Sequence, residues 1–445
     1  MAFNIDGLLG KAGIHAGDRI LIESKSRGIR LEGELMPKTE NNAADILVIK
    51  LPNGYNIGIR SSADMRIEKI AEGRMNFEFP KSTASPLRGK PKVQLIYTGG
   101  TIGSKIDYKT GGVHMLLKPE ELLYEVPELE GIADIEVKQL FNIASEDMSY
   151  VEWQRIAKEV AEALNRGKRG AIITTGTDTM HYIASALSFM LGNTDAPVVI
   201  TGAQRSSDRG SSDAFLNLSC AAKLAAYSNI AEVGICMHAS SSDSKCAFIR
   251  GVRARKMHTT RRDAFRAIND KPIAYVGSSL DIEYAGDYRR TSGKNMEVKA
   301  QTGFEKKVAL VKAYPNSDPG IIEFYMGKGY KGIIIEGTGM GHTPVSTEHE
   351  GFSWLPEIKK AIDSGIVVGM TSQCLYGRVN PNVYRNLRLL SNAGVIYCED
   401  MLPETAYVKL GWLLGNYGAE EARELLSKNI AGEISKRSKY DNFLV

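Results

Sequence analysis

The sequence lacks the features that mark membrane, secreted and disulfide-rich proteins. No hydrophobic run approaches the roughly 18 unbroken apolar residues of a membrane-spanning helix. The first residues contain no basic segment followed by an apolar one, so we expect no signal peptide. The five cysteines are nowhere spaced as Cys-x-x-Cys. Neither a disulfide framework nor a bound metal is therefore predicted, and we expect a cytoplasmic protein.

A strong excess of one charge is also absent. The 445 residues include 56 basic and 52 acidic side chains, a formal net charge of +4. This excess is too small to indicate a self-sufficient nucleic-acid-binding surface. With 43% hydrophobic and 24% charged residues, the composition is typical of a folded globular protein. At roughly 100–200 residues per domain, the length predicts two to four domains.

The first zone, residues 1–79, has the pattern of a small all-β domain. Short runs rich in Ile, Leu and Val alternate with turn residues, and no long helical periodicity is present. These runs are residues 19–23, 30–35, 45–51 and 55–59. We predict a small β barrel of the SH3 or Sm-like type. Residues 80–92 are rich in proline, serine and basic side chains and predict a linker.

From residue 93 onward the pattern changes to alternating strands and helices. In residues 93–285 we expect strands at 93–97, 170–175, 197–201, 233–237 and 273–277, with helices near 178–191 and 213–228. This alternation predicts parallel strands with helices on both faces of the sheet.

A second α/β zone follows a polar stretch, residues 286–306, that predicts a second linker or a long exposed loop. Residues 307–445 form a smaller α/β domain in this interpretation. Its four expected parallel strands are residues 308–314, 331–337, 366–371 and 394–398, with helices at 318–329 and 403–415.

The strand at 93–97 leads directly into a glycine-rich turn that contains Thr101. The adjacent Gly99 and Gly100 allow a sharp turn and bring backbone N–H groups close to a ligand. The turn matches neither of the common phosphate-binding patterns. It is either a loop that presents a nucleophilic threonine or a plain strand-to-loop turn, and this segment alone does not decide between them.

Thr177 and Asp178 stand between the strand at 170–175 and a helix. Ligands of open α/β sheets bind at such positions. Threonine and aspartate are also good helix N-caps, and for an isolated motif capping is the better explanation. The polar stretch that begins at Thr201-Gly202-Ala203-Gln204-Arg205 is likewise either a ligand loop or a connection.

The segment from Arg250 to Arg262 is strongly basic. A run of charge usually indicates a solvated face. Alternatively, a basic residue here could lie in an active site and change the proton affinity of a neighbouring hydroxyl.

Taken in order, these motifs resemble the L-asparaginase/glutaminase amidohydrolase family. YTGGTIGS (97–104) resembles its first threonine signature and TTGTDTMHY (174–182) its second, while ITGAQR, DAFLNL and ARKMHTT resemble the segments that follow. The resemblance covers roughly residues 93–445 and implies an asparaginase-like two-domain α/β core. The N-terminal β domain is absent from plain asparaginases and resembles that of the archaeal-type, tRNA-dependent amidotransferase members.

The resemblance also implies roles for particular residues. Thr101 resembles the threonine that attacks the side-chain amide, and Thr177, Asp178 and Lys256 resemble the second catalytic group. Ser145 matches the serine that contacts the substrate α-carboxylate, and Asp178 resembles the anchor of the α-amino group. Glu146 stands where the family often has glutamine. Tyr108 is a candidate for the family's tyrosine near the first threonine.

The implied function is the release of ammonia from glutamine, with asparagine as another possible substrate. The ammonia would pass to a partner subunit (E-type) that uses ATP and Mg²⁺ to activate Glu-tRNA(Gln) for conversion to Gln-tRNA(Gln). This chain itself would bind no cofactor, and it has no Walker-type loop. A homodimer within a heterotetramer is expected. The alternatives are a free-standing asparaginase or glutaminase, and a catalytically inactive RNA-binding or scaffold subunit.

Overall fold

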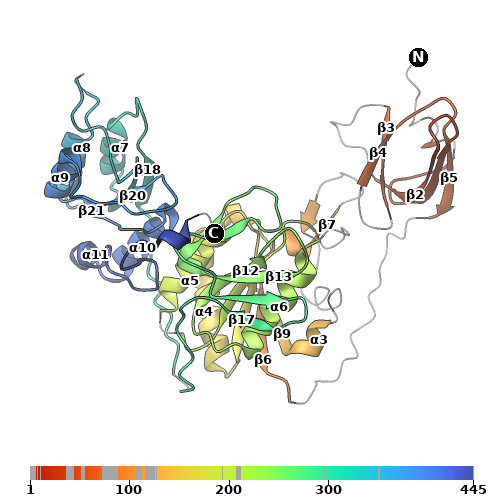
Figure 1. The fold of residues 1–445 in the computed structure, drawn as a ribbon, viewed down its shortest axis with the longest axis horizontal. Coiled ribbons are helices and arrows are strands. Elements are labelled where there is room, and N and C mark those ends of the chain that lie inside the picture. The colour runs from red at the N-terminus through yellow and green to blue at the C-terminus, as the bar shows by residue number, and fades with distance from the viewer. Residues whose placement is uncertain are drawn as a thin grey trace.

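The computed structural model describes most of the 445-residue chain. The described residues are 7, 9–10, 12–36, 45–51, 56–72, 89–106, 113–115, 126, 128–192, 194–206, 212–294, 296–348 and 351–443. Figure 1 shows the fold, in which an N-terminal β sheet precedes two α/β layers. No helix in the described part is long and apolar enough to cross a membrane.

The N-terminal sheet confirms the all-β prediction and adds a fifth strand. Its order is β4-β3-β2-β1-β5, with every described pair antiparallel. The strands are β1 (Arg19–Ser24), β2 (Ile29–Leu35), β3 (Ile46–Lys50), β4 (Asn56–Arg60) and β5 (Arg66–Ala71). Alternate residues such as Ile20, Ile22 and Ile49 point to one side and form its core. The described residues show no ladder between β4 and β5, so the sheet leaves these strands at its edges.

The large sheet of the second zone is mixed rather than purely parallel. Its order is β17-β16-β13-β12-β11-β10-β6-β9, and the five strands from β12 to β9 pair in parallel. The strands are β6 (Lys92–Tyr97), β9 (Asp134–Gln139), β10 (Gly170–Thr174), β11 (Val198–Thr201), β12 (Val233–His238), β13 (Lys245–Arg250), β16 (Ala274–Gly277) and β17 (Ile282–Tyr284).

The expected strand at 273–277 is present as β16, but its predicted parallel pairing is wrong. It pairs antiparallel with β13, which the sequence analysis did not identify and which itself returns antiparallel to β12. The reason lies in the connections. Only residues 239–244 join β12 to β13, too few for the crossover that parallel strands require. The longer connection from β13 to β16 contains short elements and no α-helix.

Helices cover both faces of the parallel part of this sheet. Ile173 and Ile200 point into one core with α4 (Tyr150–Asn165) and α5 (Met180–Met190). Their neighbours Ile172 and Val199 point into the other core with α3 (Glu128–Ile132) and α6 (Ala214–Tyr227). Successive residues of a strand face opposite sides, so the continuous apolar runs noted in the sequence bury both faces.

The C-terminal layer confirms the four parallel strands predicted there. Its order is β18-β19-β20-β21. The elements are β18 (Val308–Lys312), α7 (Gly320–Gly327), β19 (Gly332–Gly337), α8 (Leu355–Asp363), β20 (Val367–Ser372), α9 (Arg385–Asn392), β21 (Ile396–Tyr397), α10 (Pro403–Asn416) and α11 (Ala419–Leu425). Helix α10 packs against α5 of the larger domain, where Phe189 stacks on Trp412 with ring centroids 5.6 Å apart.

Short elements complete the chain. They are η1 (Thr101–Gly103), η2 (Ser145–Asp147), η3 (Gly251–Arg253), η4 (Tyr440–Asn442), and the hairpins of β7 (Ser104–Ile106) with β8 (Val113–Met115) and of β14 (Ala254–Lys256) with β15 (Phe265–Ala267).

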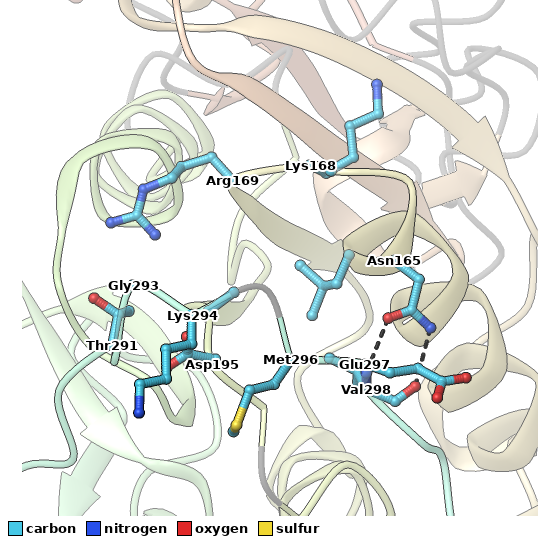
Figure 2. A pocket seen from close by; sticks show the side chains of 13 residues that line it. Asn165, Lys168, Arg169, Asp195, Thr291, Gly293, Lys294, Met296, Glu297 and Val298 are labelled. Carbon is cyan, nitrogen blue, oxygen red and sulfur yellow. Dashed lines mark hydrogen bonds between the residues drawn. The ribbon is translucent and has the colours of Figure 1, made fainter.

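The polar stretch 286–306 is largely exposed, as expected, but it is also tied to the body of the protein. The Asn165 side chain donates to the carbonyl oxygen of Val298 and accepts from its N–H group, at 3.1 and 2.9 Å. Figure 2 shows this pair of hydrogen bonds, which holds the stretch against the end of α4. Farther along, the Trp412 indole donates to the Gln301 carbonyl oxygen. The stretch therefore joins the two α/β domains, and hydrogen bonds hold it against both of them.

Candidate active site

The predicted catalytic residues gather at one edge of the large sheet. Strands β6, β10 and β11 are parallel neighbours in register, so their carboxyl ends lie side by side. The loops that follow them contain Thr101, Thr177 and Gln204. Loops at the carboxyl ends of parallel strands are where α/β proteins bind ligands.

The first loop requires its two glycines. Gly99 and Gly100 adopt φ angles of 111° and 88°, which other residues rarely take. A Cβ atom on Gly100 would lie 2.3 Å from the Gly176 nitrogen, so the loop packs backbone to backbone against the second loop. Thr101 follows directly and begins η1, half-buried. In the described part, no hydrogen bond joins the Thr101 side chain to the other predicted residues.

The second loop directs its side chains to Lys256 and not to the helix that it precedes. The N-cap residue of α5 is Thr179, so neither Thr177 nor Asp178 caps the helix. Instead, Lys256 Nζ donates to Thr177 Oγ1 at 2.8 Å and to Asp178 Oδ1 at 2.6 Å. The capping explanation is therefore wrong for both residues.

Lys256 and Asp178 differ sharply in their exposure. The Lys256 side chain is 9% exposed and that of Asp178 is 65% exposed. One partner of this ion pair is thus buried in the protein, while the other opens to solvent at the edge of the sheet. Thr177, the second acceptor of the Lys256 ammonium group, is buried.

The basic segment around Lys256 is a solvated face only in part: residues 250–256 are buried or half-buried, whereas residues 257–261 are exposed. Arg253 is 2% exposed, and it donates to Asp400 and to the Gly432 carbonyl oxygen of the C-terminal domain. The other arginines also bind carboxylates. These pairs are Arg250 with Glu232 and Asp270, Arg255 with Glu404, Arg261 with Asp263, and Arg262 with Asp243. The charges of these arginines are therefore compensated locally by carboxylates.

Ser145 and Glu146 lie beside the second loop, on η2. The Ser145 carbonyl oxygen accepts from the Thr179 hydroxyl at 2.6 Å, and its Oγ accepts from the Thr179 N–H at 3.4 Å. A Cβ on Gly176 would lie 2.8 Å from Ser145 Oγ, so the serine borders the glycine. Ser145 is buried and Glu146 is exposed. The candidate Tyr108 lies outside the described residues.

Two further side chains border the site that sequence reasoning did not single out as functional. Gln204, within the quoted ITGAQR motif, accepts a 3.5 Å hydrogen bond from the Thr177 hydroxyl through Oε1. His181 is buried in the first turn of α5. Burial, together with the positive charges of Arg255 and Lys256, lowers the pKa of His181 to about 3, so it is neutral beside the lysine. The sequence signal that could have identified His181 is its place within the TTGTDTMHY motif.

A cavity lies at the opposite edge of the sheet. It measures about 630 Å³ and is lined by Asn165, Lys168, Arg169, Asp195 and Lys294, among others. Figure 2 shows these side chains, which lie near the amino-terminal ends of β10 and β11. Thr177 and Gln204 follow the opposite ends of the same strands, so this cavity is not part of the candidate site. The described residues contain no cluster of three or more His, Cys, Asp or Glu placed to hold a metal.

Comparison with known proteins places the chain in a defined class. The family model "Asparaginase, N-terminal" matches residues 92–288, and "Glutaminase/Asparaginase C-terminal domain" matches 307–426. The L-asparaginase from Thermococcus kodakarensis superposes with a TM-score of 0.67 at 30% identity, covering 77% of this chain and 99% of that one. The predicted asparaginase-like two-domain core is thereby confirmed, and the chain has the fold of an asparaginase-type amidohydrolase.

The N-terminal sheet narrows the assignment. Residues 14–70 match the "GatD N-terminal domain" model. The D-type subunit of glutamyl-tRNA(Gln) amidotransferase from Pyrococcus abyssi is 49% identical over 99% of both chains, and that from Pyrococcus furiosus is 50% identical over 99% of this chain and 100% of its own. This chain belongs to the family of D-type glutamyl-tRNA(Gln) amidotransferase subunits. The three matched ranges leave gaps where the two linkers are predicted, and the exact domain limits remain predictions.

Proposed function

We propose that this chain releases ammonia from glutamine by nucleophilic attack of a threonine, and that a partner subunit uses the ammonia to convert Glu-tRNA(Gln) to Gln-tRNA(Gln). The observation that carries the proposal is the contact of Lys256 Nζ with both the Thr177 hydroxyl and the Asp178 carboxylate, beside the loop of Thr101. The curated D-type relatives, which share its full length, support the substrate and the assembly.

The mechanism begins with a hydroxyl that is a poor nucleophile until a base removes its proton. In our assignment, Thr101 Oγ1 attacks the amide carbonyl carbon, and its proton is passed on through the lysine–threonine pair. In this assignment, backbone N–H groups of the glycine turn or near Thr177 would stabilise the oxyanion, each contributing roughly 3 kcal/mol. The C–N bond then breaks, the nitrogen leaves as ammonia after protonation, and a threonyl ester remains. Water hydrolyses the ester to glutamate and restores the hydroxyl.

Substrate orientation is assigned to the polar groups around the two loops. Ser145 would contact the α-carboxylate, and Asp178, with its exposed carboxylate, would bind the α-ammonium group. Glu146, exposed beside Ser145, would add a second carboxylate to the substrate site. Two carboxylates favour a cationic substrate group over a neutral one.

The decisive experiment separates ammonia production from ammonia use. In the assembled complex with its E-type partner, ATP and Mg²⁺, Thr101→Val should abolish glutamine-dependent amidation of Glu-tRNA(Gln). Amidation supplied with free ammonia should continue at the parent rate, because the change leaves the partner untouched. Full glutaminase activity in Thr101→Val would refute the nucleophile assignment, and Thr177→Val tests the second threonine in the same way.

Two rival functions give different outcomes. A free-standing asparaginase or glutaminase would turn over at its full rate without partner or tRNA. An inactive scaffold or RNA-binding subunit would show no glutaminase in any assembly and would protect tRNA from nuclease when alone. The four side chains retained at the site favour the enzyme.

The partner interaction is assigned to the N-terminal sheet. Strands β4 and β5 end the sheet without a described neighbour, and exposed strand edges pair readily with other chains. We expect the working assembly to contain two copies of this chain and two of the partner. Deletion of residues 1–90 should prevent assembly in size-exclusion chromatography while the remaining chain keeps its glutaminase activity. Intact assembly of the deleted form would remove this role.

A further inference from the structure

A chain of buried polar side chains runs behind Thr177 and Gln204. It starts at Asp213, the N-cap of α6, which is almost fully buried. The Asp213 carboxylate accepts from the backbone N–H groups of Gln204 and Arg205, each at 3.0 Å. Asp213 thereby sets the position of the loop whose Gln204 side chain receives the Thr177 hydroxyl.

Asn217, one turn farther along α6, has only one possible amide orientation. Its Nδ2 donates to the Gly202 carbonyl oxygen at 2.9 Å and to Asp213 Oδ2 at 3.0 Å, and both partners can only accept. The amide oxygen must therefore be the atom that faces His238. The distance from Asn217 Oδ1 to His238 Nδ1 is 2.7 Å, so that ring nitrogen carries a proton.

The other nitrogen of His238 also faces an acceptor. His238 is 1% exposed, and its Nε2 lies 3.0 Å from Asp243 Oδ1. Asp243 receives a second donor, Arg262 Nη1, at 2.6 Å, and this guanidinium favours the ionised carboxylate. A ring with an acceptor at each nitrogen has all its hydrogen bonds only when both nitrogens are protonated.

The polar chain returns to the candidate site through Arg262. This residue lies in the turn between β14, which ends at Lys256, and β15. The same turn is closed by Asp263, which accepts from Arg261 and Arg266. Together, these hydrogen bonds form a connected series of residues, which we call the polar circuit. It runs from Thr177 through Gln204, Asp213, Asn217, His238, Asp243 and Arg262 to the turn that follows Lys256.

We propose that His238 is a positioning residue that, as a doubly protonated imidazolium, holds the Gln204 loop and the Lys256 turn in register with each other. The proposal rests on the proposed glutaminase function, in which Thr177 and Lys256 act together. The titratable and charged groups that face His238, directly or through one neighbour, are Asp243 and Arg262 on the loop side, Asp213 through Asn217, and the Cys246 thiol on β13. Loss of one ring proton removes one of the two hydrogen bonds of the His238 ring and so breaks the circuit at this residue.

The first test is spectroscopic and independent of activity. In the full chain labelled with ¹⁵N-histidine, both ring nitrogens of His238 should show protonated shifts at pH 7, the resonances being assigned by their absence in His238→Gln. A neutral ring, with one unprotonated nitrogen at pH 7, would overturn the proposal.

The second test is the pH profile of glutaminase kcat. The parent should lose activity in an alkaline step that His238→Gln lacks, with kcat about tenfold lower and KM changed less than twofold. Asp243→Asn removes the anion that favours the imidazolium, so the step should move to lower pH. His15→Gln, an exposed histidine just before the N-terminal sheet, is the matched control and should leave the step in place. An unmoved step in Asp243→Asn would overturn the proposal.

The outcomes separate the two proposals. If Thr177→Val abolishes glutaminase and His238 proves neutral, the positioning role fails and the function stands. If no glutaminase is found in any assembly, the proposed function fails, and the ¹⁵N spectra still decide the charge of His238. Should His238→Gln not fold, as judged by circular dichroism, Asp243→Asn carries the test, since Asp243 is 66% exposed.

Discussion

Two lysine–carboxylate ion pairs of this protein have the same chemistry and differ in their exposure to solvent. Lys409 and Glu433 are both 0% exposed, whereas Lys256 pairs with the largely exposed Asp178. Glu433 also accepts from the backbone N–H groups of Ile430 and Ala431, so its oxygens are fully occupied. The first pair has no room for a ligand, while the second ends at an open edge next to two threonines. The exposure of one partner distinguishes a structural pair from a pair that can take part in chemistry.

The largest expected effect is that of Lys256→Met on catalysis. Removing a general base typically costs 10²–10⁴-fold, so kcat for glutamine hydrolysis should fall about 10³-fold, or about 4 kcal/mol. The free energy of unfolding should change by less than about 1 kcal/mol, because Asp178 remains solvated. Steady-state kinetics and urea unfolding measure both. Lys299→Met, an exposed lysine, serves as the control. If Lys256→Met unfolds at a lower urea midpoint than the parent but keeps its activity, the Lys256–Asp178 pair is structural and the distinction between the two pairs is wrong.

Lys409→Met should show the opposite pattern. It leaves the buried Glu433 carboxylate without its cation, which costs about 3 kcal/mol of unfolding free energy. Burial lowers the pKa of Lys409, although the Glu433 charge opposes that shift. Glutaminase activity per folded molecule should stay within about twofold. Adding Glu433→Gln should recover part of the lost stability, and equal urea midpoints for the single and double variants would contradict the explanation.

Glu404→Gln tests the ion pair between Arg255, which is partly exposed, and Glu404, which is buried. Glu404 binds Arg255, the residue before Lys256, from the start of α10. Burial raises the pKa of Glu404, while the Arg255 charge opposes the shift. The neutral amide keeps a hydrogen-bond acceptor but loses the charge, so we expect about 1–2 kcal/mol lower stability and a severalfold lower kcat. An unchanged kcat would show that the two domains do not share the positioning of Lys256.

The smallest expected effect is on the free energy of unfolding at acid pH. Hydrogen bonds from Arg261, and then from Arg266, lower the pKa of Asp263 to about 2, below its ordinary 3.8. A carboxyl with a depressed pKa contributes stability above its unfolded value that is lost as the pH falls from about 4 towards 2. Arg261 is half-exposed, so solvent screening limits the contribution to about 1 kcal/mol. The difference in unfolding free energy between parent and Asp263→Asn should be present at pH 6 and vanish near pH 2.

Much of the fold was predictable because its patterns are local. Short apolar runs identified β6, β10, β11 and the four C-terminal strands. Pairing direction was less accessible, as β13 and β16 show. An antiparallel return needs only a short connection, and the sequence there resembles any other buried strand.

The candidate site was also predictable in part. Thr101, Thr177 and Asp178 could be found because they follow strands directly. The roles of Arg253 and Arg255 could not, because their carboxylate partners Asp400 and Glu404 lie about 150 residues away in the chain. Similarly, nothing local to His238 indicates that Asn217 and Asp243 place an acceptor at each ring nitrogen.

The sequence alone determined which segments become strands and helices and which loops carry hydroxyls, since these depend on periodicity and turn chemistry over a few residues. The tertiary structure alone decided that Lys256 reaches Thr177 across 79 positions, that its neighbouring charges are paired, and that a buried polar circuit joins the two loops. Such contacts arise from the packing of distant elements, and the desolvation that makes their charges consequential does not exist until that packing is complete.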